Sequence, residues 1–381
     1  MPCELSQYLL DMKKEKIIVG LSGGVDSSVA ALLLKQQGYN VEGLFMKNWD
    51  EQSEDGSCMW EADVEDAMHV CEVLGIHLNT VDLAEDYWDQ VFSHFINEYR
   101  NGRTPNPDVL CNQEIKFNTF MSLALAQGAD RIATGHYARI KYEQGHYQLL
   151  KGLDENKDQS YFLCRLGQEQ LSKSLFPIGA MKKPDVRELA RDHGLITHDK
   201  KDSTGICFVG ERDFREFLSR YIPKQPGAIL SPERDLLGHH DGVFYYTLGQ
   251  RQGLGIGGVR GQGEDPWYVV GKDIHNNILY AAQGHNHPLL FSKGLLTHSM
   301  HWVLGQPPAT AFRCMAKTRY RQPDQTCTVE VGETSECRVT FDTDQRAVTP
   351  GQYIVLYDGA VCLGGGVIES TWQAEKIPQP A

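Results

Sequence analysis

The strongest constraint on the fold is an alternation of short apolar runs and longer amphipathic runs through the first half of the chain. Apolar runs of four to eight residues between turn signals are typical of buried parallel strands, and a 3.6-residue period is typical of helices. We expect strands at 16–21, 41–46, 76–82 and 130–136, and helices at 26–37, 61–74, 84–99 and 113–127. We also expect Asp26 or Ser27 to cap the first helix. This order predicts a doubly wound α/β domain.

The pattern changes after about residue 210. A stretch rich in Pro and Gly, 221–232, has the composition of a linker. Short strands are expected after it, and Asn276–Asn277 is a candidate hairpin turn between two of them. These strands are 243–247, 267–270, 278–281, 327–331, 338–341, 353–357 and 366–368. We therefore expect an N-terminal tail (1–14), the α/β domain (15–215), a small central module (216–285) and a C-terminal β-barrel (286–381).

Charge is distributed unevenly. The chain has 381 residues and a net charge of −13, but 42–98 alone holds fifteen acidic residues and one basic residue. The rest is close to neutral and has room for basic patches at 181–201 and 313–321, each of which, taken alone, we expect to be solvated surface. The chain has no apolar run of membrane-spanning length, and its start does not resemble a secretory signal. We therefore expect a cytoplasmic protein whose ten cysteines are thiols.

The motif with the clearest chemistry is Ser22–Ser27, between the first expected strand and the first expected helix. Glycines let a phosphate approach main-chain N–H groups, and the helix N-terminus attracts its charge. The stretch lacks the lysine of a Walker loop and matches the S-G-G-x-D-S loop of enzymes that split ATP into AMP and pyrophosphate. Gly253–Gly258 fits a dinucleotide fingerprint in letters only, because no helix can follow it, and we expect a mobile surface loop there.

Two cysteines stand out from the other eight. Cys111 follows a proline-stiffened loop that carries Asp108, and we expect it just before a helix, where a thiolate is favoured. Cys207 lies in a polar loop near two lysines. The chain has no C-x-x-C pair, so a zinc site is poorly supported and no metal ligand is assigned. We expect Cys71, Cys164, Cys314, Cys327, Cys337 and Cys362 to serve packing, Cys58 to be disfavoured as a thiolate by nearby acids, and Cys3 to lie in the tail.

Several long motifs, in order, resemble the tRNA-specific 2-thiouridylase family, and the resemblance runs from about residue 16 to residue 369. Its motifs are Gly20–Ser28, Gly102–Asp108 with Cys111 and Asn112, Ala133–Tyr137, Lys157–Tyr161, Ser203–Phe208, Tyr246–Leu254 and Thr318–Arg321. The resemblance implies ATP- and Mg²⁺-dependent adenylation of the wobble uridine of a tRNA, followed by sulfur transfer that yields 2-thiouridine, AMP and pyrophosphate. It also implies a monomer that receives sulfur from a persulfide carrier or a cysteine desulfurase.

The resemblance also implies residue roles. Cys207 carries the persulfide, Cys111 resolves it by forming a disulfide, and Asp108 is the acid or base. ATP is bound by Gly20, Leu21, Ser22, Gly23, Gly24, Val25, Asp26, Ser27, Met46 and Gly135. The target base is contacted by Asn106, Pro107 and Asp108, and the rest of the tRNA by His136, Lys157, Asp158, Gln159, Arg319, Tyr320 and Gln352.

Two alternatives remain open at this point. One is another ATP pyrophosphatase, such as an amidotransferase-type synthetase or argininosuccinate synthetase, which would not need two reactive cysteines. The other is a non-catalytic tRNA-binding or sulfur-carrier protein, which would not need an intact Ser22–Ser27 loop. Release of pyrophosphate with and without tRNA distinguishes all three.

Overall fold

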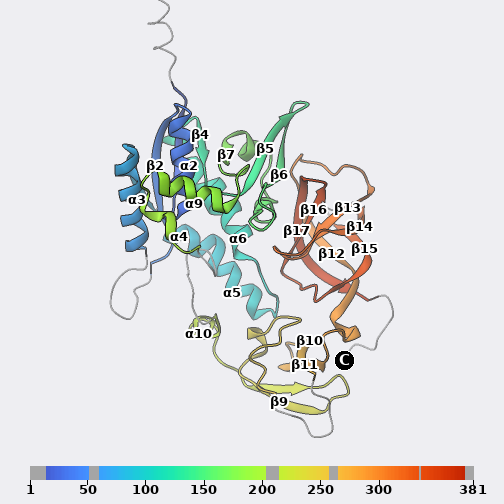
Figure 1. The fold of residues 1–381 in the computed structure, drawn as a ribbon. Coiled ribbons are helices and arrows are strands. Elements are labelled where there is room, and N and C mark those ends of the chain that lie inside the picture. Colours follow the sequence, from blue (N-terminus) through green and yellow to red (C-terminus); the bar gives the residue numbers. More distant parts are fainter. Residues whose placement is uncertain (1–13, 51–59, 203–213, 257–264, 334–335, 374–381) are drawn as a thin grey trace, which may run out of the picture. The chain divides into compact units, whose positions relative to one another are not determined.

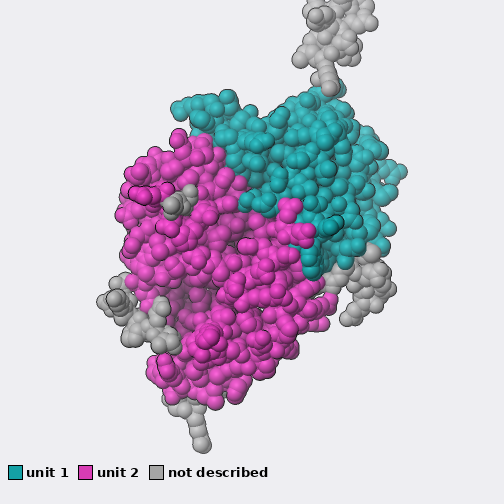
Figure 2. All heavy atoms as spheres, turned by 180° about the vertical axis from the view of Figure 1, so that it is seen from behind, with its two compact units in different colours: residues 1–88, 112–160, 166–204 teal, residues 89–111, 161–165, 205–381 magenta. Residues whose placement is uncertain are grey.

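The structure, a computed structural model, describes residues 14–50, 60–202, 214–256, 265–333 and 336–373 (Figure 1). The chain folds into two compact units (Figure 2). Unit 1 comprises 1–88, 112–160 and 166–204, and unit 2 comprises 89–111, 161–165 and 205–381. Cys3, Cys58, Cys207 and part of the glycine-rich stretch at 253–258 lie outside the described residues.

Unit 1 is built on a five-stranded parallel sheet, which confirms the expected α/β fold. Its strands are β1 (Lys16–Leu21), β2 (Asn40–Lys47), β3 (His77–Asp82), β4 (Arg131–Ala133) and β7 (Ser174–Leu175), in the spatial order β3-β2-β1-β4-β7. All neighbouring pairs are parallel. The strand order reverses between β1 and β4, so the loops after these two strands lie side by side at the carboxyl edge of the sheet, where such folds bind ligands.

Three helices bury their apolar faces in the core of unit 1: α2 (Val25–Gln36), α3 (Glu61–Leu74) and α9 (Lys183–Asp192). Val29, Val70 and Val186, one from each helix, are fully buried in the same cluster as the sheet. Helix α3 ends at Gly75, which adopts the left-handed conformation that favours glycine. The expected cap of α2 is wrong, because its N-cap is Gly24 and no side chain caps it.

The two expected helices at 84–99 and 113–127 are each interrupted by a π-helical stretch. The first comprises α4 (Ala84–Tyr87), a π segment (Trp88–Phe92) and α5 (Ser93–Arg100). The second begins earlier than expected and comprises α6 (Pro107–Leu110), a π segment (Cys111–Thr119) and α7 (Phe120–Ala126). π segments are frequent at functional sites, and the second begins at Cys111.

Unit 1 also contains elements that we did not expect from the sequence. These are strand β7, helix α9, the antiparallel pair β5 (Ala138–Glu143) and β6 (His146–Lys151), helix α8 (Gln168–Ser172) and a 3₁₀ turn at Ile196–Asp199. Another unexpected 3₁₀ turn, Ser160–Leu163, begins at the last residue of one unit 1 segment and continues in unit 2. The segment Ala138–Glu143 alternates apolar and polar residues, a two-residue period typical of a half-buried strand, so β5 could have been expected from the sequence.

The central part of unit 2 is a four-stranded sheet after a short helix, α10 (Phe214–Ser219). Its strands are β8 (Gly227–Leu230), β9 (Leu236–His240), β10 (Trp267–Asp273) and β11 (Ile278–Gln283), in the order β10-β11-β8-β9. The turn at Asn276–Asn277 joins β10 to β11 and is confirmed, with Asn277 at φ 55°. The expected strand at 243–247 is wrong: Val243–Tyr245 is a 3₁₀ turn, because a short aromatic run carries no period that separates strand from turn.

The C-terminal part of unit 2 is a closed six-stranded β-barrel, as expected. Its strands are β12 (Phe291–Trp302), β13 (Ala311–Lys317), β14 (Gln325–Val331), β15 (Cys337–Arg346), β16 (Tyr353–Asp358) and β17 (Val361–Trp372), with a 3₁₀ turn at Pro288–Leu290 before them. The order is β12-β15-β14-β13-β16-β17, and β12 pairs with β17 to close the barrel. Val329, Val339 and Ile354 belong to its buried interior. Among the described residues, no helix is long and apolar enough to cross a membrane.

Candidate functional site

The glycine-rich loop lies between β1 and α2 and is shaped by its own hydroxyl groups. Ser22 N donates to Ser27 Oγ at 3.2 Å, and the hydroxyls of Ser27 and Ser28 donate to Gly24 O at 3.1 and 2.8 Å. Gly23 has φ 68°, and a Cβ there would lie 2.2 Å from Asp63 O, so only glycine fits. The loop is therefore a compact turn at the start of a helix, the geometry that binds phosphate.

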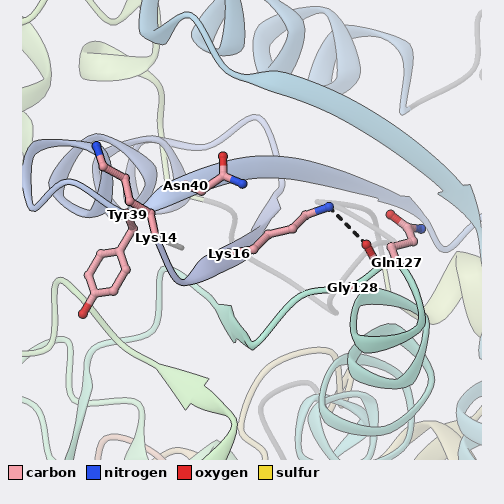
Figure 3. Close-up of a pocket in the computed structure, with 6 residues that line it drawn as sticks. All are labelled: Lys14, Lys16, Tyr39, Asn40, Gln127 and Gly128. Carbon is pink, nitrogen blue, oxygen red and sulfur yellow. Dashed lines mark hydrogen bonds between the residues drawn. The ribbon is translucent and has the colours of Figure 1, made fainter. Parts of the chain in front are cut away.

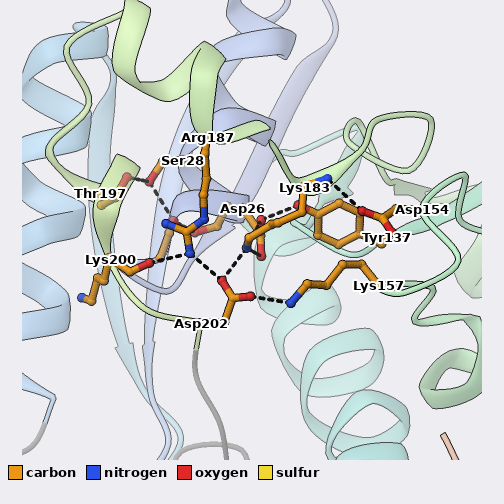
Figure 4. A network of polar contacts seen from close by, with 12 residues as sticks. Asp26, Ser28, Tyr137, Asp154, Lys157, Lys183, Arg187, Thr197, Lys200 and Asp202 are labelled. Atoms are coloured by element: carbon orange, nitrogen blue, oxygen red, sulfur yellow. Dashed lines mark hydrogen bonds and ion pairs between the residues drawn. The ribbon is translucent and has the colours of Figure 1, made fainter. Parts of the chain in front are cut away.

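Asp26 of this loop is the first member of a charged network (Figure 4). Both of its carboxylate oxygens accept from Lys183 Nζ at 2.8 Å, and Oδ1 also accepts from Tyr137 OH at 2.7 Å. Lys183 is 8% exposed at the start of α9, and its main-chain N–H donates to Asp154. Because a buried lysine needs a partner, the Asp26 carboxylate holds the positive charge of Lys183 beside the Ser22–Ser27 loop.

Asp202 is the second carboxylate of the network, and it is the last described residue before the gap at 203–213. It pairs with Lys183 at 2.7 Å, Arg187 at 2.9 Å and Lys157 at 2.5 Å. Burial by itself would raise the pKa of Asp202, but hydrogen bonds from Lys157 and Lys183 outweigh it and lower the pKa to about 2. Three cations thus surround one carboxylate close to Asp26 (Figure 4).

The basic stretch at 181–201 is therefore not simply solvated surface, and that expectation is wrong. Besides Lys183 and Arg187, Lys200 pairs with Asp63 at 2.7 Å and with Asp66. The acidic and basic stretches of the sequence partly neutralise each other in the fold. No sequence period could have revealed the pairs of Lys183 with Asp26 and of Lys200 with Asp63, because these partners are more than a hundred residues apart.

The other expected ATP-binding residues of unit 1 also lie at this edge of the sheet. A Cβ on Gly135 would lie 2.6 Å from Ser27 N, so the segment after β4 packs directly on the loop. A Cβ on Gly20 would lie 3.6 Å from Met46 Cε, which places Met46 over the end of β1. Sequence reasoning missed Asn48, two residues beyond Met46: it is 2% exposed, and neither atom of its amide has a hydrogen-bond partner. A buried unsatisfied amide is costly, so Asn48 is a candidate ligand contact.

The residues expected to contact tRNA from unit 1 are largely held by unit 1 itself. Gln159 Oε1 accepts from Tyr137 N at 2.9 Å, and Asp158 Oδ1 accepts from Gly152 N and Ser160 N. His136 is 8% exposed, and burial, helped by the nearby charge of Lys116, lowers its pKa well below the usual value. A neutral His136 can offer a ring face or one hydrogen bond, but no charge.

In unit 2, the loop before α6 is held by the barrel turn at 349–352. Gln352 Nε2 donates to the carbonyls of Thr104 and Pro105 at 2.8 and 3.1 Å, and Thr104 N donates to Pro350 O at 3.0 Å. Gly351 has φ 94°, and a Cβ there would clash with the backbone of Thr104. Gln352, expected as a tRNA contact, thus positions the loop that carries Asn106.

Asn106 and Asp108 lie at the start of α6. Asn106 is the N-cap, and its Oδ1 accepts from Val109 N at 3.3 Å. Cys111 is fully buried and lies one turn inside the helical segment, so our expectation that it precedes the helix is wrong. A narrow cavity of about 10 Å³ adjoins Asn106, Pro107, His94 and Tyr353. That is room for one water and not for a base.

The four basic residues at 313–321 fall into two groups. Arg313 and Lys317 lie near carboxylates, whereas Arg319 contacts carbonyl groups and Arg321 lies near an aromatic ring. Arg313 pairs with Asp342 at 2.5 Å, and Lys317 lies 3.8 Å from Asp324. Arg319 instead donates to the carbonyls of Arg346 and Ala347. The Arg321 guanidinium lies 5.9 Å from the centre of the Tyr320 ring, and the Tyr320 ring packs 4.4 Å from that of Phe162. The aromatic–arginine pair resembles a platform on which a base can stack.

One further surface pocket lies at the opposite end of the unit 1 sheet. Its lining comprises Lys14, Lys16, Tyr39, Asn40, Gln127 and Gly128 (Figure 3). Lys16 Nζ already pairs with Glu42 at 3.0 Å and donates to Gln127 O. The pocket borders the amino ends of β1 and β2, away from the loop, and we assign it no role.

The fold and the loop define a class of nucleotide-handling α/β proteins with an appended barrel. A family model described as "tRNA methyl transferase HUP domain" matches residues 15–211, a "tRNA methyl transferase PRC-barrel domain" matches 215–283, and an "Aminomethyltransferase beta-barrel domain" matches 292–368. Relatives named tRNA-specific 2-thiouridylase MnmA are 57–58% identical over 94–95% of this chain, so the chain belongs to that family.

Three relatives carry that name. The protein of Marinobacter nauticus is 58% identical over 95% of this chain and 93% of its own length. That of Alkaliphilus oremlandii is 57% identical over 94% and 98%, and that of Francisella tularensis subsp. novicida is 58% identical over 94% and 100%. The similarity thus covers both units.

Proposed function

We propose that this protein is a sulfurtransferase that converts the wobble uridine of tRNA to 2-thiouridine at the expense of ATP. The observation that carries the proposal is the sequence identity of 57–58% to 2-thiouridylases along nearly the whole chain. The family models mention methyl transfer, but the Ser22–Ser27 loop has the form of a pyrophosphate site, which favours the name that the relatives carry.

In the first step, ATP lies on the Ser22–Ser27 loop with Met46 and Gly135 beside it. Uracil oxygen 2 attacks the α-phosphate, pyrophosphate leaves, and carbon 2 of the base carries an AMP leaving group. Main-chain N–H groups of the loop and the charge of Lys183 stabilise the departing phosphates. Asn48 offers its unpaired amide to the nucleotide.

Mg²⁺ is the cofactor that we expect to accompany ATP. The described residues contain no group of three or more His, Cys, Asp or Glu side chains suited to a metal, and both oxygens of Asp26 already accept from Lys183. The residues present therefore do not form a dedicated metal site. We assign the ion to the nucleotide phosphates, which commonly hold Mg²⁺ with few protein ligands.

In the second step, Cys207 carries a persulfide received from a sulfur carrier or a cysteine desulfurase. Its terminal sulfur attacks carbon 2, and AMP leaves with the electron pair. The Cys111 thiolate then attacks Cys207 Sγ, and the bond between Cys207 Sγ and the transferred sulfur on carbon 2 breaks. 2-Thiouridine is released, and a Cys111–Cys207 disulfide remains. Asp108 moves a proton in this sequence. A disulfide needs Cα atoms within about 7 Å, so the two cysteines must approach during transfer.

The tRNA contacts are proposed at two kinds of residue. By the resemblance, Asn106, Pro107 and Asp108 meet the flipped uridine, and the cavity of about 10 Å³ beside Asn106 and Pro107 is too small to hold the base itself. Lys157, His136, Arg319 and Tyr320 meet the rest of the RNA, while Gln352 acts through the 104–105 backbone that it holds. The reaction is expected in the cytoplasm, with the protein as a monomer.

The test combines pyrophosphate release with mass spectrometry of the modified tRNA. Wild type should release pyrophosphate when tRNA is present and form 2-thiouridine. Cys207→Ser should release pyrophosphate but accept no persulfide, and Cys111→Ser should load Cys207 and stall before product. Cys71→Ser, a buried helix position, is the matched control and should behave as wild type.

Three results would overturn the proposal. Pyrophosphate release that does not depend on tRNA would favour another ATP pyrophosphatase. Binding of tRNA without any pyrophosphate would favour a non-catalytic RNA-binding protein. Full thiolation by Cys111→Ser would remove that residue from the mechanism.

A further inference from the structure

Two barrel cysteines that the sequence suggested were packing residues lie in direct contact. Cys314 on β13 and Cys327 on β14 are opposite each other in the antiparallel register. Their sulfur atoms are 3.7 Å apart, and Cys327 Sγ also approaches Cys314 O at 3.6 Å. Both are thiols in this structure.

The backbone at this pair already suits a covalent bond. Residues directly opposite in an antiparallel pair have Cα atoms about 4.5–5.5 Å apart. Disulfides span Cα separations of about 4.4–6.8 Å. Side-chain rotation is therefore enough to join the two sulfurs, and the strands need not move.

The two thiols differ in reactivity. Cys327 is fully buried in the barrel interior, and its contact with the Cys314 sulfur, together with burial, raises its pKa strongly. It therefore stays protonated. Cys314 is only half-buried. Cys314 is thus the sulfur that a small oxidant in solution reaches first.

We propose that Cys314 and Cys327 form a redox-sensitive dithiol that hydrogen peroxide converts to a disulfide. The Cys314 thiolate attacks one peroxide oxygen, the O–O bond breaks, and a sulfenic acid and hydroxide form. The Cys327 sulfur then attacks the Cys314 sulfur, the S–O bond breaks, and hydroxide leaves with the Cys327 proton as water. The two thiols lose two electrons in total, and the peroxide gains them.

The position of the pair gives the oxidation a consequence. Cys314 and Cys327 lie just below the loop 318–324 that joins β13 to β14, and this loop carries Arg319, Tyr320 and Arg321. A cross-link there holds the two strands together and restrains the loop. Under the proposed function this loop contacts tRNA, and Arg319 must leave the carbonyls of Arg346 and Ala347 to reach a phosphate. The oxidised protein is therefore the weaker tRNA binder.

The first test is chemical and independent of catalysis. The full-length protein is treated with hydrogen peroxide, alkylated and digested with trypsin and a Glu-specific protease, because cleavage at Glu330 separates Cys327 from Cys337. We expect a peptide pair joined through Cys314 and Cys327, lighter by two hydrogens and released by dithiothreitol. Cys111→Ser, defective in the proposed reaction, should form it equally well, and Cys337→Ser, buried in the same barrel, is the matched control.

Peroxide treatment that leaves both thiols open to alkylation, or that takes Cys314 to sulfinic acid without a cross-link, would overturn the dithiol. The second test measures the affinity for tRNA of peroxide-treated wild type and of Cys314→Ser treated in the same way. Oxidation of Cys111 and Cys207 would affect both proteins equally, so it cannot cause a difference between them. We expect wild type to bind about threefold or more weakly. Equal affinities would overturn the link to RNA binding, whether or not the disulfide forms.

Discussion

The loop region of unit 1 and the Asn106 loop of unit 2 hold their candidate site residues by different forces. Around Asp26, ion pairs dominate, and Lys183 is shared between Asp26 and Asp202. Around Thr104 and Pro105, the contacts to the barrel turn are neutral hydrogen bonds from the amide of Gln352 and to the backbone of Pro350. Ion pairs enter at the preceding residue, Arg103, which pairs with Glu98 and Glu369.

This difference matters for how each region meets its ligand. Under the proposed function, a phosphate that enters the charged region replaces a carboxylate, because Lys183, Lys157 and Arg187 already have carboxylate partners. The charge is thus held in place and only partly exposed to water, which is a form of preorganisation. The hydrogen bonds of Gln352 and Pro350 are a geometric support whose effect should not depend on salt.

The largest effect is expected at Asp26. Asp26→Ala leaves Lys183 with Asp202 as its remaining carboxylate partner in the network and disturbs the start of α2. We expect pyrophosphate release to fall by about 100-fold or more, while tRNA binding is retained. Asp185→Asn, an exposed acid in the first turn of α9, is the control. Normal release by Asp26→Ala would break the assignment of the loop.

Asn48 tests whether the charged region also contains a neutral ligand contact. Asn48→Leu removes a buried amide that has no partner, so the melting temperature should stay the same or rise. The KM for ATP should rise about tenfold, the loss of one good hydrogen bond. Asn40→Leu, at the exposed opposite end of β2, should change neither quantity. Lower stability together with an unchanged KM would show that the amide is merely structural.

Gln352 tests the neutral brace. Gln352→Ala removes two hydrogen bonds from the 104–105 carbonyls, and we expect the rate of thiolation to fall about 3- to 10-fold through loss of positioning. The dependence of tRNA binding on salt should not change, because no charge is lost. Gln283→Ala, a side chain that holds Asp265 O in the central sheet, is the comparison. A reduced salt slope in Gln352→Ala would mean that this side chain binds RNA through the phosphates.

The barrel arginines test whether an arginine that is paired with a carboxylate contributes less to tRNA binding than one that is not. Arg319→Ala and Arg321→Ala should each weaken tRNA binding and lower the salt slope by about 1. Arg313→Ala should do less, because Arg313 is already paired with Asp342. Titration of tRNA at several salt concentrations gives the three slopes, and equal slopes for all three variants would remove the distinction.

The smallest effect concerns acid stability. The pKa of Asp202 is lowered from 3.8 to about 2 by its cationic partners, so its contribution is complete above about pH 4 and is lost as the pH falls towards 2. Through this residue, the free energy of unfolding changes by at most about 1.4 kcal/mol per pH unit. Asp202→Asn should flatten this part of a denaturation curve, and Asp199→Asn, an exposed carboxylate, should not. An unchanged slope in Asp202→Asn would mean that the network adds no stability.

Parts of the fold and of the site were predictable because their signals are local. The run Lys16–Leu21, the helix 61–74 closed by Gly75 and the glycines of Ser22–Ser27 all follow from periods and turn chemistry within a few residues. The 3₁₀ turn at Val243–Tyr245 and the π segments could not be found in this way, because tertiary packing overrides weak local preference.

What the sequence by itself determined is therefore the α/β alternation, the phosphate loop, the barrel and, through its motifs, the resemblance to 2-thiouridylases. The tertiary structure alone decided which distant charges meet, that Gln352 supports the Thr104 backbone, that Asn48 is buried without a partner and that Cys314 faces Cys327. The physical reason is range. Strand and helix periods act over neighbouring residues, whereas an ion pair or a cross-strand contact depends on strand order and register, which are properties of the whole folded chain.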